Sequence, residues 1–399
     1  MDWLGYAKID FTHAPSPVSL SENDGNQTDL LKVCEKITPP CRMNPLLFNG
    51  HLQTMWTATK QHGPPVYYRR KVFHAEDKAF DGTFAVDFVT EPFKDVDSTL
   101  PPRTKYFEDQ DFETLPSDDD RPQLIVLHGL SGGSHEIYLR HAIAPLIDSG
   151  KWEVCVVNSR GCANSKFTSG ILYNARATWD FRQYCGEEGV NCELTAAIAC
   201  SNPFNLEVAN KALKRNFLGR EVYQRVMGTS MKQLIADHKE EVQKHTNLDL
   251  ERIQNLTYLW EFDREVQCIS WGYPTESAYY RDASSCDAVL AIRIPFLALH
   301  ATDDPIAVNE AIPYEEFEKN PYTVLCTTSL GGHLCWFEPG GGRWHAKPVQ
   351  VANFFNHMAF NVDHSQLPPK TTSAPPTNGK SEFHFNPVRR KMEIKAGSD

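Results

Sequence analysis

The sequence predicts an α/β fold in which a mostly parallel central sheet is flanked by helices. The clearest indication is residues 123–133, QLIVLHGLSGG, where an apolar run ends in a glycine-rich turn and 134–147 continues as a helical pattern. A second apolar run at 152–157 completes a strand, helix and strand, which form a right-handed βαβ unit. Three later strand-like runs, at 193–200, 294–300 and 322–328, each end in a loop and extend the same pattern.

The composition fits a globular chain with one large domain and appendages, or with two ordinary domains. The chain has 399 residues, of which 41% are hydrophobic, and this is enough for a substantial core. A formal net charge of -11 and the lack of a dense Lys/Arg run argue against a nucleic-acid-binding protein. The 11 cysteines are scattered and never spaced C-x-x-C, so reduced thiols in an intracellular protein are expected. No signal peptide and no transmembrane run are recognised.

The first third of the chain is predicted to contain a leader, a helix and a strand pair. Residues 1–40 are polar and are expected to form a loose N-terminal leader. A helix is expected to start within 46–59, where the polar side chains fit a functional or a structural role equally well. The alternating runs 67–74 and 83–90 predict an antiparallel pair, and 95–121 is a polar insertion.

The remainder is predicted to complete one folded domain over residues 41–362. A helix is expected over 175–183, and the helix-forming composition of about 205–268 predicts a helical cap insertion. A last helix covers about 348–359, and the segment 363–399, rich in Pro, Ser and Lys, is expected to be a disordered tail.

The glycine-rich turn allows two interpretations. Gly129-Leu130-Ser131-Gly132-Gly133 fits the G-x-S-x-G pattern of a nucleophile elbow, which would make Ser131 a nucleophile. A strand that stops at such a turn and restarts as a helix also points backbone N–H groups and the helix dipole at one place, where they stabilise negative charge. In that case the turn is an oxyanion loop and the nucleophile lies elsewhere.

The loops after two later strands carry an acid and a histidine. Asp303 and Asp304 follow the run at 294–300, and His333 follows the run at 322–328. Because parallel strands end at one edge of the sheet, these side chains are expected on the same rim. A serine hydrolase needs an acid to orient a histidine, which activates the nucleophile. The structural alternatives are that His333 is an ordinary turn residue and that Asp304 is a helix N-cap.

Five motifs together resemble the α/β-hydrolase domain 4 family. They are FNGHLQT at 48–54, LHGLSGGSHE at 127–136, NSRGCANS at 158–165, ATDDPI at 301–306 and GGHLCWFE at 331–338. The family includes bacterial YheT-type esterases, animal phospholipases and fungal medium-chain fatty-acid ethyl ester synthase/esterases, and the motifs are most similar to the fungal branch. The resemblance covers about residues 40 to 360 and implies an α/β-hydrolase fold.

The resemblance implies a serine-type ester hydrolase or alcohol acyltransferase that acts on medium-chain acyl esters. His333 matches the family's catalytic histidine, and Asp304 matches its acid better than Asp303, because the acid normally stands directly before Pro-Ile. The backbone of Leu130, with Gly129, matches the oxyanion loop, which leaves Ser131 a weak nucleophile candidate. No metal or organic cofactor is implied. The partners are an acyl ester or acyl donor and an alcohol, and association with a lipid droplet or mitochondrial surface is implied without a visible anchor.

The family's own nucleophile segment is missing from the sequence. Only about ten residues separate the helical pattern ending at Gln183 from the run at 193–200, whereas a strand, an elbow and a helix are needed there. In the family the elbow strand lies in the middle of the sheet, so its loss would leave two edges unpaired. The hypothesis is that the chain is a splice form or a mis-joined gene model, with the junction between Gln183 and Tyr184.

Two other hypotheses remain. One is a non-catalytic lipid-binding or regulatory pseudoenzyme that keeps the acyl pocket under the helical cap. The other is a chain that does not fold stably, because several unpaired groups at ~1–3 kcal/mol each would exceed an ordinary stability of about 5–15 kcal/mol.

Overall fold

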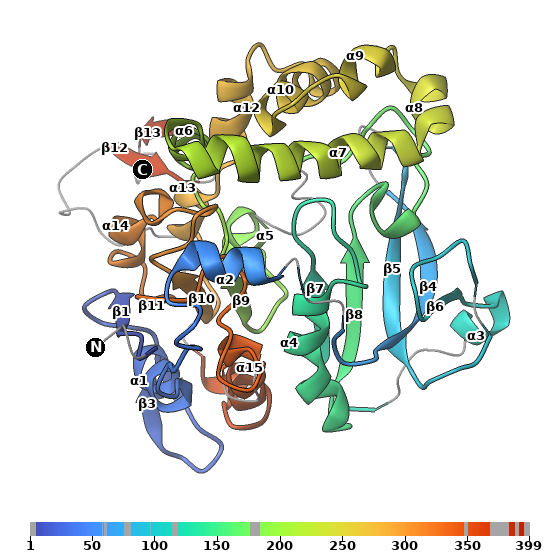
Figure 1. The fold of residues 1–399 in the computed structure, drawn as a ribbon. Helices are drawn as coiled ribbons and strands as arrows, with labels where there is room; N and C mark the ends of the chain where they lie inside the picture. Colours follow the sequence, from blue (N-terminus) through green and yellow to red (C-terminus); the bar gives the residue numbers. More distant parts are fainter. Residues whose placement is uncertain are drawn as a thin grey trace. The chain divides into compact units, whose positions relative to one another are not determined.

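The computed structural model describes residues 5–57, 59, 62–75, 81–95, 97–113, 119–175, 184–346, 350–367, 383–387 and 391–394 (Figure 1). Its internal contacts divide the chain into two compact units. Unit 1 comprises Met1–Thr59, Phe181–Ala209 and Ser284–Asp399, and unit 2 comprises Lys60–Asp180 and Asn210–Ala283. Both units combine strands and helices, which confirms the predicted α/β class.

Unit 1 is built on a four-stranded sheet in the order β1-β11-β10-β9. Its strands are β1 (Ile9–His13), β9 (Ala197–Cys200), β10 (Phe296–Ala301) and β11 (Thr323–Thr328). The strands β9, β10 and β11 run parallel, as predicted, and β1 pairs antiparallel with β11. Every residue of β10 and β11 is buried, as expected for parallel strands that are covered on both faces.

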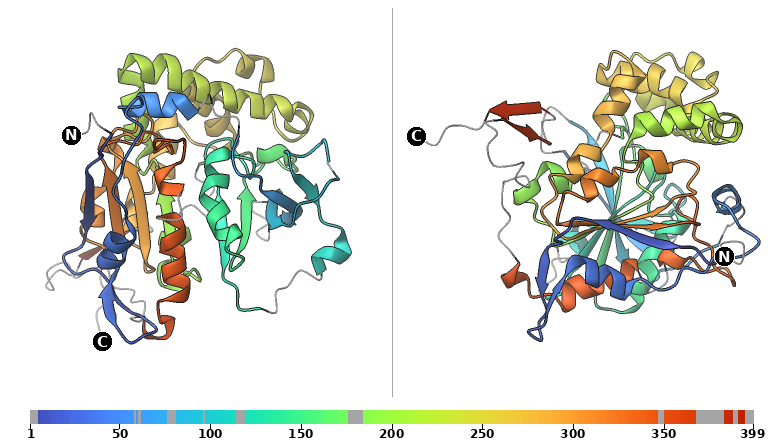
Figure 2. Two further views of the ribbon diagram at one scale, coloured as in Figure 1. Left: turned by 60° about the horizontal axis from the view of Figure 1, so that its bottom comes forward. Right: turned by 90° about the vertical axis from the view of Figure 1, so that its left-hand side faces the viewer.

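Helices cover both faces of this sheet (Figure 2). On one face, α1 (Leu30–Ile37) and α15 (Val351–Phe360) pack on Leu297, Leu299 and Val324. On the other face, Phe296, Ala298 and Leu325 pack against the segments around α13 (Cys286–Val289) and α14 (Tyr314–Phe317). The unit also contains α2 (Gly50–Thr57) and α5 (Tyr184–Glu187).

The N-terminal segment differs from the loose leader expected over residues 1–40. Besides β1, it forms β2 (Ser19–Ser21), β3 (Gln27–Asp29) and α1, and Leu20 and Leu30 are fully buried in the core. The side chain of Asp29 caps α1 by accepting the Lys32 N–H at 2.9 Å. In the segment expected as a disordered tail, the described part contains the antiparallel pair β12 (Phe383–Asn386) and β13 (Lys391–Ile394), and the remainder after residue 367 lies outside the described residues.

Unit 2 contains a five-stranded sheet in the order β6-β4-β5-β8-β7. The predicted antiparallel pair is confirmed as β4 (Tyr67–His74) and β5 (Thr83–Thr90). The predicted βαβ unit is also confirmed: β7 (Gln123–Leu127) and β8 (Glu153–Asn158) run parallel and are connected by α4 (Ile137–Asp148). The polar insertion contributes β6 (Thr104–Tyr106), parallel to β4, and the short α3 (Asp109–Glu113).

The region expected to be a helical insertion is helical. It contains α6 (Leu206–Arg215), α7 (Arg225–Asp237), α8 (Lys239–His245), α9 (Leu250–Gln254), α10 (Leu259–Phe262), α11 (Cys268–Trp271) and α12 (Glu276–Ala283), with π-helical segments at Gly219–Gln224 and Asp263–Gln267. Within unit 2, its apolar side chains pack on Phe167, Leu172 and Tyr173. None of the described helices is both long enough and apolar enough to cross a bilayer.

Two parallel strands each stand at the end of a sheet. Among the described residues, β9 pairs only with β10, and β7 pairs only with β8. All four residues of β9 are half-buried, whereas all six of its neighbour β10 are buried. Each of these two strands therefore has one edge without a strand partner in the described structure. The helix predicted over 175–183 falls almost entirely on residues outside the described ones.

Candidate active site

Asp304 and His333 meet at the carboxyl ends of neighbouring parallel strands in unit 1. Asp304 follows β10 and His333 follows β11, and the Nδ1 atom of His333 lies 2.9 Å from the Oδ2 atom of Asp304. The carboxylate side chain is fully buried, while the imidazole is 23% exposed. In this arrangement the acid orients the histidine through Nδ1 and leaves its Nε2 atom available as a general base.

The two oxygens of Asp304 have different partners. Oδ1 accepts the N–H groups of Ile306 at 2.8 Å and Ala307 at 2.9 Å, and Oδ2 is left for His333. Burial acts to raise the pKa of this carboxyl, but His333 and the N–H donors outweigh it and hold the pKa below its ordinary value. Asp304 is thus ionised at neutral pH, and it caps its own turn as well as bonding the histidine.

Asp303 takes a different role from its neighbour. Its Oδ1 atom accepts the Gly332 N–H at 2.9 Å, and its buried Oδ2 atom has no hydrogen-bond partner among the described residues. Burial raises the pKa of this carboxyl to about 6. Asp303 therefore binds the backbone of the loop after β11, at Gly332, rather than the imidazole of His333.

In unit 2 the glycine-rich turn after β7 is held by hydrogen bonds on both sides. His128 accepts the Ser159 N–H through Nε2 at 3.0 Å, so Nδ1 carries the proton and donates to the Gly129 carbonyl at 2.7 Å. The Gly129 N–H donates to the Tyr138 hydroxyl at 2.6 Å. No described residue accepts the N–H of Leu130. Of the two expected oxyanion donors, Gly129 is therefore already engaged.

Ser131 lies in the same turn with a φ of +50°. This left-handed conformation is uncommon for a residue with a side chain. Ser131, Leu130 and Gly129 belong to unit 2, whereas Asp304 and His333 belong to unit 1. The structure thus brings two of the predicted site residues into contact and places the other three in one separate turn.

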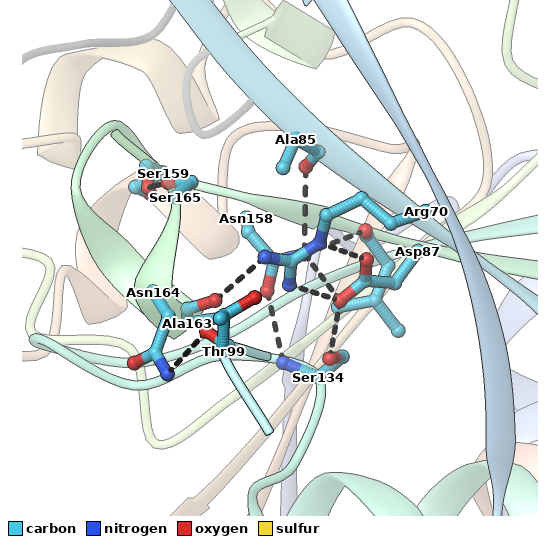
Figure 3. A network of polar contacts seen from close by, with 11 residues as sticks. Arg70, Ala85, Asp87, Thr99, Ser134, Asn158, Ser159, Ala163, Asn164 and Ser165 are labelled. Atoms are coloured by element: carbon cyan, nitrogen blue, oxygen red, sulfur yellow. Dashed lines mark hydrogen bonds and ion pairs between the residues drawn. The ribbon is translucent and has the colours of Figure 1, made fainter. Parts of the chain in front are cut away.

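A buried ion pair supports this turn (Figure 3). The Arg70 guanidinium binds both oxygens of Asp87, with Nε–Oδ1 at 2.7 Å and Nη2–Oδ2 at 2.8 Å, and both side chains are fully buried. Asp87 also accepts the Ser134 hydroxyl at 2.5 Å and the Asn158 amide at 2.8 Å. Asn158 in turn accepts the Ser134 N–H at 2.9 Å, so the network joins the residue that follows the glycine-rich turn to the end of β8.

Arg70 and Asp87 were not among the residues singled out from the sequence. The structure identifies them as partners, because they occupy opposite positions in the register of β4 and β5. The sequence carries a signal for Asp87 alone. A lone aspartate in the apolar run TFAVDFV indicates a charge that needs a buried partner.

Comparison with known proteins yields lipases and esterases. No family model matches the chain. The chain is 32% identical over 361 residues to a monoacylglycerol lipase of Saccharomyces cerevisiae, covering 76% of this chain and 78% of the relative. It is 28% identical over 412 residues to medium-chain fatty acid ethyl ester synthase/esterase 2 of the same organism, covering 84% and 90%. It is 24% identical over 341 residues to the Homo sapiens phospholipase ABHD3, covering 78% and 76%.

Proposed function

Because the chain belongs to the α/β-hydrolase domain 4 family, whose members compared above are lipases and esterases, we propose that Asp304 and His333 are the acid and base of a serine-type ester-hydrolysing site. The observation that carries this proposal is the 2.9 Å separation of His333 Nδ1 and Asp304 Oδ2. With its Nδ1 proton bound to Asp304, the imidazole has Nε2 available to accept the proton of a serine hydroxyl. It later gives that proton to the leaving alcohol, while Asp304 stabilises the imidazolium.

The proposed substrates are medium-chain acyl esters. Two of the relatives are a monoacylglycerol lipase and a medium-chain fatty acid ethyl ester synthase/esterase, and the substrates that these names give contain an acyl ester bond. In the proposed reaction a serine takes the acyl group and releases the first alcohol. Water then gives hydrolysis and a second alcohol gives transfer, since both attack the same acyl-enzyme. We also propose that the protein associates with the surface of lipid droplets or mitochondria, which cell fractionation tests.

The proposed oxyanion donor is the backbone N–H of Leu130. Its support is local: the neighbouring Gly129 N–H already donates to Tyr138, and the turn is fixed by His128 and by Ser134. One such donor is typically worth about 2.7–4 kcal/mol in the transition state.

We further propose that the nucleophile belongs to a strand, elbow and helix that this chain lacks between Gln183 and Tyr184. The support is the position of β7 and β9, each of which has a strand neighbour on one side only among the described residues. Both are short, apolar parallel strands, and neither has the lysine, proline or bulge that protects natural sheet edges. The chain is accordingly a splice form or a mis-joined gene model of an active esterase.

A fluorophosphonate probe, which reacts with activated serines, tests this function. The 399-residue chain should remain unlabelled and should not hydrolyse p-nitrophenyl octanoate. A longer form with an in-frame G-x-S-x-G segment at the junction should be labelled on that serine, and H333A in the longer form should abolish labelling. Labelling of the printed chain at Ser131 would refute the assignment of this turn as an oxyanion loop.

The second candidate function is a lipid-binding or regulatory protein without catalysis. It is favoured by the sequence, which offers no nucleophile other than the weak candidate Ser131. Binding of medium-chain acyl lipids by the printed chain, without any labelling, would support it. A continuous gene across the junction would support it further.

A further inference from the structure

We infer that α2 is the support of the histidine loop and that Thr54 is a positioning residue for His333. The histidine loop is defined as residues 331–337. The inference rests on the proposed role of His333. It assigns a function to the FNGHLQT motif, whose polar side chains fit a functional or a structural role equally well by sequence. All the contacts that support it lie within unit 1.

Three successive backbone N–H groups of the histidine loop donate to side chains from three different segments. The donors are the N–H groups of residues 332–334. The acceptors are Asp303 Oδ1 at 2.9 Å, Thr54 Oγ1 at 3.1 Å and Ser201 Oγ at 3.1 Å. The N–H that Thr54 accepts is that of His333 itself, so Thr54 binds the residue whose side chain must reach Asp304.

The histidine loop cannot hold this shape by regular secondary structure. Gly332, Leu334 and Trp336 have φ angles of +60°, +57° and +42°. A non-glycine residue in this region persists only where its surroundings over-determine it. The side-chain acceptors that bind residues 332–334 are therefore among the contacts that fix the backbone from which the imidazole projects.

Close backbone contacts fix α2 against both catalytic loops. A Cβ atom on Gly50, the first residue of α2, would lie 1.8 Å from the carbonyl oxygen of Asp303. A Cβ atom on Gly332 would lie 2.7 Å from the carbonyl oxygen of Gly50 and 2.9 Å from Thr54 Oγ1. Only glycine fits at these two positions, which places the start of α2 directly against Asp303 in the loop after β10 and against the histidine loop.

Two more side chains of α2 hold the far end of the histidine loop. Gln53 is fully buried and accepts the Phe337 N–H at 2.9 Å while its amide donates to the Leu47 carbonyl at 3.0 Å. Thr57 Oγ1 lies 3.0 Å from the thiol of Cys335. The Cys335 thiol also donates to the His333 carbonyl at 2.7 Å. Three side chains of one short helix thus contact residues 333, 335 and 337 of the histidine loop.

The contact between Thr54 and His333 acts on geometry and not on charge. Asp304 keeps its own backbone donors when the Thr54 hydroxyl is removed, so the acid stays in place. The His333 N–H, by contrast, loses its acceptor. A catalytic side chain must be held within about 0.5 Å of its productive position, and a loop released at this point does not meet that limit.

The test is NMR spectroscopy of the full 399-residue chain with ¹⁵N-labelled histidine. The signal to follow is the hydrogen-bonded Nδ1 proton of His333, assigned by its loss in H333Q. T54V should broaden or remove this signal, and T54S, which restores the hydroxyl, should recover it. T59V is the matched control, because the Thr59 hydroxyl donates to the Trp56 carbonyl at 2.7 Å and not to the histidine loop.

The outcomes separate this inference from the proposed function. An unchanged Nδ1 signal in T54V would overturn the positioning role while leaving the Asp304–His333 pair intact. If the parent chain has no such signal, or if D304N leaves the signal unchanged, the proposed site itself fails. Thermal melts accompany every spectrum, and if T54V does not melt cooperatively, T54A carries the same test with a smaller side chain.

Discussion

Asp303 and Asp304 are neighbours in the chain, but their carboxylates bind different parts of the same loop. Asp304 Oδ2 lies 2.9 Å from the His333 imidazole, and Asp303 Oδ1 lies 2.9 Å from the Gly332 N–H. Their surroundings also act in opposite directions. Burial raises the pKa of Asp303 to about 6, whereas for Asp304 the effect of burial is outweighed by His333, and its pKa is lowered. The two residues therefore predict opposite dependences of stability on pH.

D303N should stabilise the protein at neutral pH. The folded state binds the Asp303 proton more tightly than the unfolded state, so the parent loses stability as pH rises from about 4 to about 6. Asparagine keeps an acceptor for the Gly332 N–H and cannot ionise. The gain in free energy of unfolding at pH 7 relative to pH 4 should be about 1–3 kcal/mol, measured by urea unfolding at both pH values. A gain that is equal at both pH values would refute burial as its cause.

D304N should destabilise the protein at neutral pH. The lowered pKa means that the ionised carboxylate contributes stability above its unfolded value, and this contribution is lost as pH falls through the folded value. The loss at pH 7 should be about 1–3 kcal/mol and should shrink below pH 4, where the parent carboxyl is itself becoming protonated. D10N is the control, because Asp10 forms a salt bridge with Lys8 and is 55% exposed. A comparable loss in D10N would argue against a specific role for the buried pair.

R70M should be among the most destabilising substitutions in unit 2. It leaves the fully buried Asp87 carboxylate without its cation, which should cost about 3–5 kcal/mol in chemical unfolding. R121M is the matched surface control, since Arg121 and Asp119 are 44% and 46% exposed, and it should cost less than about 1 kcal/mol. Equal losses in the two variants would show that the Arg70–Asp87 pair does not support the turn.

The strands and the acid–histidine pair were predictable because they depend on local patterns. The alternating runs predicted β4 and β5, and the rule that parallel strands end at one edge predicted that Asp304 and His333 would meet. The N-terminal segment was not predicted, because β1 alternates only briefly, as Ile9-Asp10-Phe11, and is completed by pairing with a strand more than 300 residues later. The polar composition of this segment gave no indication of the short edge strand β1 or of α1, a helix with four buried side chains.

Polar contacts between distant residues could not be predicted from the sequence. Thr54 and His333 are 279 residues apart, and a threonine in a helix start has no pattern that identifies its partner. Arg70 lies among charged neighbours in β4, where alternation suggests a solvated side chain, yet it shares the buried face with Tyr68. Only the register between β4 and β5 shows that Asp87 stands opposite.

We propose that the Asp304–His333 pair serves a serine carried by a segment that this chain lacks. The most direct measurement is the genomic and transcript sequence across the codons for Gln183 and Tyr184. An in-frame segment that encodes an apolar strand, a G-x-S-x-G turn and a helix is expected there. An uninterrupted coding sequence in genomic DNA, with no such segment in any transcript, would contradict it.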